Sequence, residues 1–330
     1  MTNNVYGIDL GTCNMKIYCK SSNKILNEKN TIALKNKDEI YAYGNSAYAI
    51  HVTFPVTTGV IADFNNLQSM IQLFLETHVK GSLKGAEFIV AVPTSITEVE
   101  KKAFFDMFYK SKMKPKSVLL CEKPIADAVG LGLDVNEPTG IMVVDIGADT
   151  TEISVISLGG LVLSDLLHFG GNKIDESIIT YVKRNYNLVI GQKTAQSMKE
   201  RLGSGIPGNE DTMIVVGRDV VSGLPIEMEM SGGVVYEAIK DNLESICNSI
   251  KMILEKTPPE LAKDIIHSGI YITGGSSQIH DLDKLFADIT GIDINTCEEP
   301  EECVVRGLVK IVSDSKYKHL AFSMKSKILI

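Results

Sequence analysis

Two stretches of the chain share one pattern of hydrophobic and polar positions. In residues 141–146 an apolar run leads to Asp145, residues 147–150 are small, polar or acidic, and an alternating apolar run follows to Ile156. Residues 5–19 repeat this order, with Asp9 near the end of the first run and Gly11 just after it. Each stretch predicts two strands joined by a tight turn. The repeat, well over a hundred residues apart, predicts two similar halves.

The other segments alternate between strand and helix patterns, which predicts an α/β fold. Thr97 followed by Glu100 predicts a capping box at a helix start, and Pro124 fits the first turn of another helix. The sequence also has Gly307 within an apolar helix, which favours close helix packing. Helices are expected over 67–79, 194–202, 234–255 and 303–312, and strands over 88–93 and from 118 and 269 onward.

Composition agrees with two halves, because 330 residues exceed the usual size of one domain. The 33 Lys and Arg residues against 41 Asp and Glu give a net charge of −8. No long basic run interrupts this balance, so nucleic acid is not an expected partner. The six cysteines have no zinc-binding spacing, so we expect reduced thiols in a cytoplasmic protein. Neither a signal peptide nor a membrane-spanning run is expected.

The two repeated turns suit a phosphate ligand. Glycine lets main-chain N–H groups approach an anion without a Cβ in the way. An Asp at the end of the incoming strand suits Mg²⁺, which prefers carboxylate and water oxygens. One such turn is common in sheets that bind nothing. Two of them, at Asp9 and Asp145, indicate two halves that face one nucleotide.

With these segments the sequence resembles the actin-like ATPase superfamily, and within it the MreB family of bacterial actins. The resemblance runs nearly end to end. The segments that carry it are Gly7-Ile-Asp-Leu-Gly11, Gly59-Val-Ile-Ala-Asp-Phe64, Pro93-Thr-Ser-Ile-Thr-Glu-Val-Glu-Lys101, Gly274-Gly-Ser-Ser277 and Arg306-Gly307.

This resemblance implies an actin-like fold of two similar halves, each with a mixed sheet flanked by helices and a small outer subdomain, with the nucleotide in the cleft. The first half would comprise residues 1–31, 63–140 and 305–330, with 32–62 as its outer subdomain. The second half would comprise 141–180 and 234–304, with 181–233 as its outer subdomain. The implied cofactors are ATP or ADP with Mg²⁺, and Asp9 and Asp145 would hold the metal through water.

The resemblance also implies the nucleotide contacts. In the family, a helix of the second half lends polar side chains to the adenosine, although Gln196, Lys199 and Glu200 could equally be a solvated helix face. Thr150 could contact the attacking water. The residues expected to bind the cofactor are Gly11, Thr12, Cys13, Asn14, Gly147, Ala148, Asp149, Gly170, Gly171, Gln196, Lys199, Glu200, Gly274, Gly275, Ser276 and Ser277.

Three positions depart from the family pattern. Lys123 stands where relatives have a glutamate that positions the attacking water, and Ala148 and Asp149 replace glycines. A protonated lysine cannot accept a proton, so slow hydrolysis is expected. Asp149 would repel the phosphate unless it is paired, and Lys123 is the natural partner. In the opposite interpretation, Lys123 stabilises charge on the phosphate. Whether the chain is an effective ATPase is left open.

The resemblance favours a cytoskeletal filament of many copies of the chain over a non-polymerising ATPase or phosphotransferase of the superfamily. A sugar kinase needs substrate loops and an aspartate base for which the chain has no obvious spare segment.

The tail, residues 316–330, carries four lysines and places Leu320, Met324 and Ile328 at helical spacing. It could bind the inner face of the cell membrane. A terminus packed on the first half is the equal alternative.

Overall fold

The computed structural model describes residues 4–36, 39–47, 52–79 and 82–325. The chain divides into two compact units. The first comprises residues 1–139, 156–166 and 301–330, and the second comprises 140–155 and 167–300. Among the described residues, no helix combines the length and the apolar character needed to span a bilayer.

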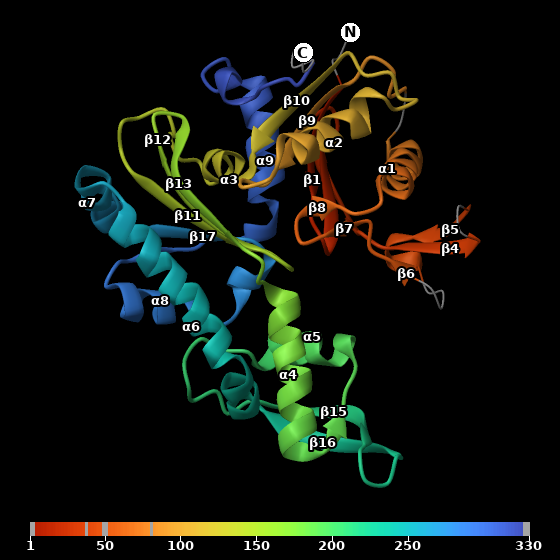
Figure 1. The fold of residues 1–330 in the computed structure, drawn as a ribbon, viewed down its shortest axis with the longest axis vertical. Helices are drawn as coiled ribbons and strands as arrows, with labels where there is room; N and C mark the ends of the chain where they lie inside the picture. Colours follow the sequence, from red (N-terminus) through yellow and green to blue (C-terminus); the bar gives the residue numbers. More distant parts are fainter. Residues whose placement is uncertain (1–3, 37–38, 48–51, 80–81, 326–330) are drawn as a thin grey trace. The chain divides into compact units, whose positions relative to one another are not determined.

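The first unit is built on a five-stranded mixed sheet of order β10-β9-β1-β2-β3 (Figure 1). Parallel pairs join β1 to β9 and β9 to β10, and antiparallel pairs join β1 to β2 and β2 to β3. The elements are β1 (Val5–Leu10), β2 (Asn14–Cys19), β3 (Lys24–Lys29), β4 (Ile32–Asn36), β5 (Glu39–Tyr43), β6 (Val52–Thr53), β7 (Val56–Thr57), β8 (Val60–Ile61), α1 (Phe64–His78), β9 (Glu87–Val92), α2 (Glu98–Tyr109), β10 (Ser117–Glu122), α3 (Lys123–Gly130) and α9 (Cys303–Ser313).

The side chains of strand β1 point alternately to the two faces of this sheet. Tyr6 and Ile8 belong to the hydrophobic core that also contains the buried residues of α1 and α2. Gly7, between them, faces α9, where an added Cβ would lie 2.9 Å from Val309 Cγ2. Because side chains alternate along a strand, one face of the sheet packs against α1 and α2 and the other packs against α9.

The local signals for helix starts are confirmed. The Thr97 hydroxyl accepts the Glu100 N–H at 3.2 Å, and the Glu100 carboxylate accepts the Thr97 N–H at 2.7 Å, which completes the capping box of α2. Helix α1 begins at Phe64 rather than Leu67, because Asp63 caps it by accepting the Asn66 N–H. Apolar spacing marked only the buried face of that helix, not its first turn.

Helices α3 and α9 pack against each other within the first unit. A Cβ on Gly307 would overlap the carbonyl oxygen of Ala126, and a Cβ on Gly130 would overlap that of Cys303. The glycines are therefore required by the closeness of the two backbones, as the position of Gly307 in the sequence predicts.

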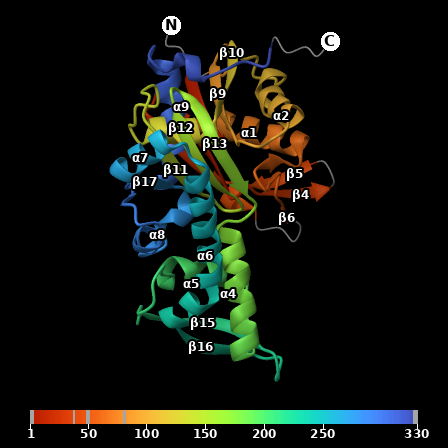
Figure 2. The ribbon, with the colours of Figure 1, turned by 60° about the vertical axis from the view of Figure 1, so that its left-hand side comes forward.

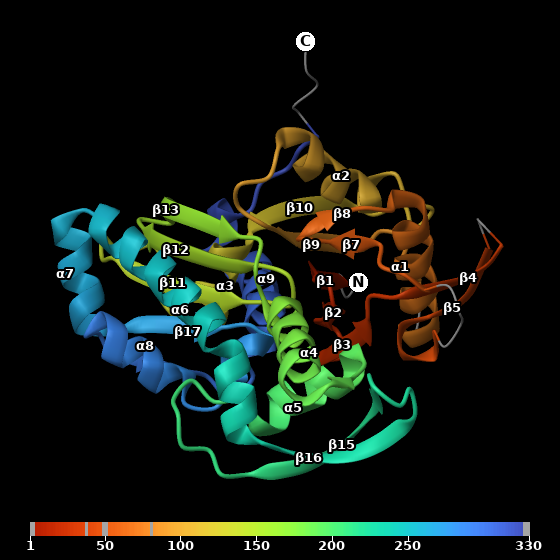
Figure 3. The same ribbon diagram turned by 60° about the horizontal axis from the view of Figure 1, so that its bottom comes forward.

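The second unit contains strands of a sheet of order β13-β12-β11-β17-β18, in which β11 pairs with β17 and β17 with β18 in parallel. The helices α4, α5 and α6 pack with the β15–β16 hairpin (Figures 2 and 3). The elements are β11 (Ile141–Ile146), β12 (Thr151–Ser157), α4 (Gly171–Tyr186), β14 (Leu188–Val189), α5 (Gln192–Leu202), β15 (Thr212–Asp219), β16 (Pro225–Ser231), α6 (Gly232–Lys256), α7 (Pro259–Ser268), β17 (Ile270–Thr273), α8 (Leu282–Thr290) and β18 (Ile294–Asn295). Strand β13 (Gly160–Leu167) is also part of this sheet, but all of it except Leu167 belongs to the first unit.

Residues 156–166, which sequence reasoning assigned to the second half, belong to the first unit. The turn between β12 and β13 explains this. The Leu158 N–H donates to the Glu137 carbonyl, and the Gly159 N–H donates to that of Val135. The division of each half into an inner part and an outer subdomain stays a prediction.

The described part of the tail packs on the first unit and does not continue as a helix. A short 3-10 turn ends at Leu320, and Phe322 exchanges two backbone hydrogen bonds with Leu120 on β10. Met324 is 4% exposed and belongs to the core of the first unit. Of the two alternatives for the tail, the packed terminus holds for these residues, whereas Ile328 lies outside the described residues.

Candidate functional site

The turn of the second unit lies between β11 and β12, as predicted. The Gly147 N–H donates to the Thr150 carbonyl at 2.8 Å and closes the turn. Asp145, next to last in β11, is 5% exposed. Gly274, at φ +85°, crosses directly over this carboxylate, and a Cβ there would overlap Asp145 Oδ1. Glycine is needed at 274 both for its backbone conformation and for this approach.

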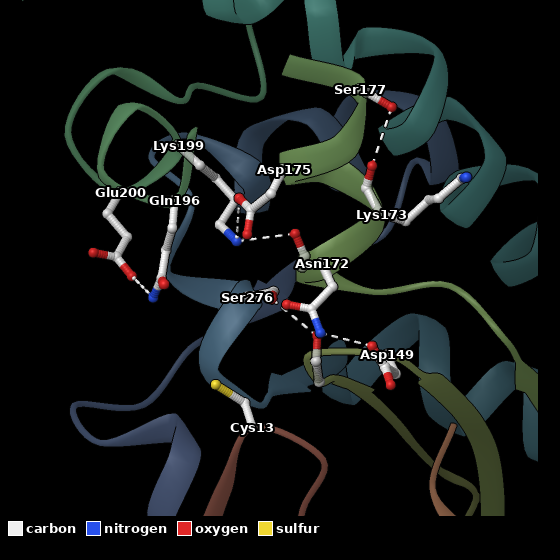
Figure 4. A network of polar contacts seen from close by, with 12 residues as sticks. Cys13, Asp149, Asn172, Lys173, Asp175, Ser177, Gln196, Lys199, Glu200 and Ser276 are labelled. Atoms are coloured by element: carbon white, nitrogen blue, oxygen red, sulfur yellow. Dashed lines mark hydrogen bonds and ion pairs between the residues drawn. The ribbon is translucent and has the colours of Figure 1, made fainter. Parts of the chain in front are cut away.

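Three segments that are far apart in sequence meet at this turn (Figure 4). The Gly147 carbonyl accepts the Gly171 N–H at 3.0 Å and the Ser276 hydroxyl at 3.0 Å, and the Ala148 carbonyl accepts the Asn172 N–H at 2.7 Å. The first N–H groups of α4 therefore bind the turn itself. Within the described chain, the N–H groups of Ala148 and Thr150 make no backbone hydrogen bond. They are the donors that an anion could use.

Asp149, which sequence reasoning paired with Lys123, has a partner in its own unit. The Asn172 side-chain amide donates to Asp149 Oδ1 at 2.7 Å. Asn172 was missed because nothing in its sequence context distinguishes it from an ordinary first-turn helix residue. Lys123 belongs to the first unit, and its pairing with Asp149 stays a prediction.

The three polar residues expected to contact the adenosine differ in environment. Lys199 is 9% exposed, and its ammonium lies 2.9 Å from Asp175 Oδ1 and donates to the Gly171 carbonyl at 3.0 Å. Gln196 donates instead to Glu200 at 2.7 Å near the surface of α5. Lys199 thus joins α5 to the start of α4, and Gln196 and Glu200 bind each other. Their contacts with an adenosine stay predictions.

Burial raises the pKa of Asp175, and the attraction of Lys199 opposes this shift without cancelling it. The Asp175 side chain is 3% exposed. Burying its charge costs free energy, which the attraction of the Lys199 ammonium partly offsets. The pair is part of the frame beneath the Gly147 turn, because Lys199 also binds the Gly171 carbonyl.

The matching turn of the first unit lies between β1 and β2. Asp9, next to last in β1, is 7% exposed, and a Cβ on Gly11 would lie 2.8 Å from the Asn14 carbonyl oxygen. Buried Asn30 supports the tip: its side-chain amide donates to the Gly11 carbonyl and its N–H to the Cys13 carbonyl, both at 2.8 Å. Each unit therefore presents a carboxylate followed by a supported turn.

Two further residues shape this tip. The Lys29 ammonium donates to Cys13 Sγ at 3.3 Å, and the Asn14 amide donates to Asn27 Oδ1 at 3.0 Å. Sequence reasoning missed Lys29 and Asn30, because both follow the predicted hairpin as polar residues without a recognisable pattern. The side-chain oxygens of Asn14 and Asn30 are buried and accept no hydrogen bond from the described residues. Such orphaned acceptors fit a site that is completed by a ligand or its water.

Lys123 begins α3, with Glu122 as its N-cap and Pro124 in the first turn. The start of a helix carries the positive end of its dipole, where an acid is favoured over a lysine. A cation here fits a site with negative charge nearby.

The carboxylates present fit Mg²⁺. Asp9 and Asp145 occupy equivalent places in the two turns, and proteins commonly hold this ion with one or two carboxylates, water and substrate phosphate. Within residues 4–36, 39–47, 52–79 and 82–325, no group of three or more His, Cys, Asp or Glu residues forms a closed metal site.

Solved structures with the same fold identify the class of protein. The structure is similar to MreB5 of Spiroplasma citri bound to AMPPNP, with a TM-score of 0.90 and 32% identity, covering 97% of this chain and 98% of that one. The ADP-bound structure of MreB5 gives a TM-score of 0.89. The MamK double helical filament gives a TM-score of 0.81 at 20% identity, which supports the fold alone. The chain has the fold of the actin-like filament proteins.

Sequence comparisons give the family. A model described as MreB/Mbl protein matches residues 3–319. The chain is 38% identical over 312 residues to the cell shape-determining protein Mbl of Bacillus subtilis (strain 168), covering 91% of this chain and 93% of the relative. It is also 38% identical over 323 residues to the cell shape-determining protein MreB of Escherichia coli (strain K12), with coverages of 93% and 92%. The chain belongs to the MreB/Mbl family.

The buried ion pair under the turn gives a prediction. Lys199→Met leaves the Asp175 carboxylate buried without its cation, which typically costs about 3–5 kcal/mol of unfolding free energy. Lys173→Met breaks a pair with Glu176 in which both side chains are more than half exposed, and should cost at most about 1 kcal/mol. Urea unfolding of both variants measures the difference.

The pH dependence of the Lys199→Met variant follows from the raised pKa of Asp175. A carboxyl group whose folded-state pKa exceeds its unfolded value penalises the folded state above that folded pKa. The penalty is relieved as the pH falls through it. The loss of unfolding free energy caused by Lys199→Met should therefore be smaller at pH 5.5 than at pH 7.5. If Lys199→Met and Lys173→Met lose the same unfolding free energy at both pH values, the assigned role of the Lys199–Asp175 pair is contradicted.

Proposed function

We propose that this chain is an ATP-binding cytoskeletal protein that polymerises into actin-like filaments in the cytoplasm and supports cell shape or related cell mechanics. The observation that carries the proposal is the matched pair of supported turns, each following a strand whose next-to-last residue is an aspartate. Relatives that share the fold bind AMPPNP or ADP, and relatives in sequence determine cell shape.

Each of the two turns would provide part of the contacts to one nucleotide. Backbone donors at Ala148 and Thr150 would bind phosphate oxygens, and the polar tip at Thr12 and Asn14 would do so from the first unit. Asp9 and Asp145 would orient the waters of Mg²⁺. The ion, when bound, neutralises phosphate charge. Gly274 to Ser277, which pack on the Gly147 turn, would lie beside the adenosine.

Assembly should depend on the nucleotide, because binding between the halves would fix their relative orientation. We expect filaments in electron micrographs of the purified protein with ATP and Mg²⁺, and fewer or none with ADP, without nucleotide, or after chelation of the metal. Monomers alone under ATP, across a wide range of protein and salt concentrations, would refute the cytoskeletal proposal.

Hydrolysis should be slow although ATP binding is intact. Lysine side chains ordinarily have a pKa near 10.4, and a charged lysine at position 123 cannot accept the proton of the attacking water. Loss of a positioned general base typically lowers a rate roughly 10²–10⁴-fold.

The test compares phosphate release by the wild type with that of Lys123→Glu combined with Asp149→Gly. The double variant should hydrolyse faster by at least tenfold, with ATP affinity measured separately. Lys112→Glu, which repeats the charge change of Lys123→Glu alone at an exposed site, serves as the control. A wild type as fast as the double variant would show that Lys123 does not limit hydrolysis and would favour its role in stabilising phosphate charge.

Membrane attachment through the tail is proposed only for a state in which residues 320–325 leave the first unit, because Met324 is buried there. Co-sedimentation with anionic liposomes, with and without residues 316–330, measures it. Lys325→Gln combined with Lys327→Gln removes charge without removing the packed residues, and should also weaken lipid binding. Unchanged binding in both variants would exclude the tail as the anchor.

A further inference from the structure

The β15–β16 hairpin of the second unit has an exposed face that is both apolar and acidic. Ile214 and Val216 on β15 are 66% and 58% exposed. Their direct partners on β16 are Glu229 and Glu227, respectively, and both glutamates are exposed. Directly opposed residues point to the same face of a sheet, as do residues two apart on one strand. These four residues therefore form one surface, which we call the hairpin face. Val215, which points to the other side, is 2% exposed.

The composition of this segment favours a partner with cations. Residues 209–231 contain five acidic residues and one cation, Arg218. Among the described residues, neither carboxylate of the hairpin face forms an ion pair. Val221, in the turn of the hairpin, is 85% exposed. Apolar side chains that are exposed together in this way mark interaction sites.

The first unit has a groove of the opposite charge. Its volume is about 730 Å³, and residues of α9 and of the β2–β3 hairpin line it. Residues 18–25 and 303–313, which supply most of this lining, contain four Lys or Arg residues and no acid. The lining combines cationic and apolar side chains, which include Lys20, Arg306, Lys310, Tyr18, Ile25 and Val309.

The cations of this groove are only partly compensated within the chain. Arg306 forms an ion pair of 2.7 Å with Glu302, which lies at the edge of the groove. Lys20 and Lys310 are exposed, and neither forms an ion pair with another described residue. The groove therefore keeps a net positive charge that an acidic surface could neutralise.

The overall charges of the two units differ in the same sense. The first unit contains 21 Lys and Arg residues against 18 Asp and Glu residues, a net charge of +3. The second unit contains 12 against 23, a net charge of −11. Complementary charge steers two proteins together and fixes their orientation. Two copies of the chain are therefore attracted with the first unit of one toward the second unit of the other.

We propose that the hairpin face of one copy docks in the groove of a second copy. This inference rests on the proposed filament and assigns one contact within it. The carboxylates of the hairpin face would meet Lys20 and Lys310, and its apolar side chains would cover the apolar lining of the groove. Because the contact uses a different surface on each partner, every pair of copies still has a free groove and a free hairpin face, and further copies can add.

The experiment reverses the charge of each surface in turn. The hairpin variant is Glu227→Lys with Glu229→Lys, and the groove variant is Lys20→Glu with Lys310→Glu. The protein concentration needed for assembly with ATP and Mg²⁺ is measured by sedimentation and electron microscopy. Each variant alone opposes like charges, so we expect it to need at least roughly tenfold more protein than the wild type. Lys20→Gln with Lys310→Gln, which removes charge without reversing it, should need a smaller increase.

The equimolar mixture of the two reversed variants is the decisive sample. The new lysines of the hairpin variant can meet the new glutamates of the groove variant, and the other two surfaces are unchanged. Copies that alternate along an assembly therefore have complementary charges at every contact. We expect the mixture to assemble at about the wild-type concentration, within roughly threefold, although each variant alone does not.

Matched charge changes elsewhere are the controls. Glu244→Lys with Glu255→Lys, at exposed positions of α6, repeats the change of the hairpin variant. Lys84→Glu with Lys112→Glu, also at exposed positions, repeats the change of the groove variant. Both should assemble as the wild type does. Thermal melts of every variant measure whether its fold is retained.

The outcomes separate this inference from the proposed function. A wild type that does not assemble with ATP overturns both. A wild type that assembles, together with a reversed variant that assembles equally well, leaves that surface to another partner and overturns the inference alone. If both reversed variants fold and neither assembles, failure of their mixture shows that the two surfaces do not meet each other and also overturns the inference.

Discussion

The carbonyl oxygen of Gly147 accepts hydrogen bonds from two other segments, and the candidate site of the second unit depends on this. A turn offers its N–H groups to an anion more effectively when its carbonyls are bound elsewhere, since a carbonyl oxygen facing the anion would repel it. Gly171 and Ser276 bind the Gly147 carbonyl, and Asn172 binds that of Ala148. The same contacts fix the start of α4 and the segment after β17. Glycine at 171 follows from this arrangement, because an added Cβ would lie 2.5 Å from the Ser276 hydroxyl and 3.0 Å from the Lys199 ammonium.

Charge is the second constraint on the site. Asp9 and Asp145 are almost fully buried, and a nucleotide would add more negative charge beside them. Cations must compensate, and the chain places lysines where the backbone alone does not favour them. Lys16 is buried on a strand, and Lys123 begins a helix. A nucleotide phosphate beside these lysines would supply the opposite charge.

The sequence predicted the parts of this structure that depend on local order. Both turns, the capping box at Thr97 and the proline start of α3 follow from residues within a few positions of one another. The hydrogen bonds that join distant segments could not be predicted in the same way. Asn30 supports Gly11 from nineteen positions away, and Asn172 reaches Asp149 from twenty-three. An asparagine carries no periodicity, so its partner appears only when the fold brings the two together.

Lys199 shows how far a family resemblance can specify a role. The resemblance placed it among the polar residues of α5 that face a nucleoside, and the structure gives its ammonium to Asp175 and the Gly171 carbonyl. These contacts do not remove Lys199 from the site. They place it one layer beneath, where it holds the start of α4 against the Gly147 turn. The pKa of Asp175 is raised by burial even with this cation beside it. Removing one partner would therefore cost more free energy than the intact pair contributes to stability. A rigid support of this kind keeps the backbone donors of the turn aimed at one position, which is what binding an anion through N–H groups requires.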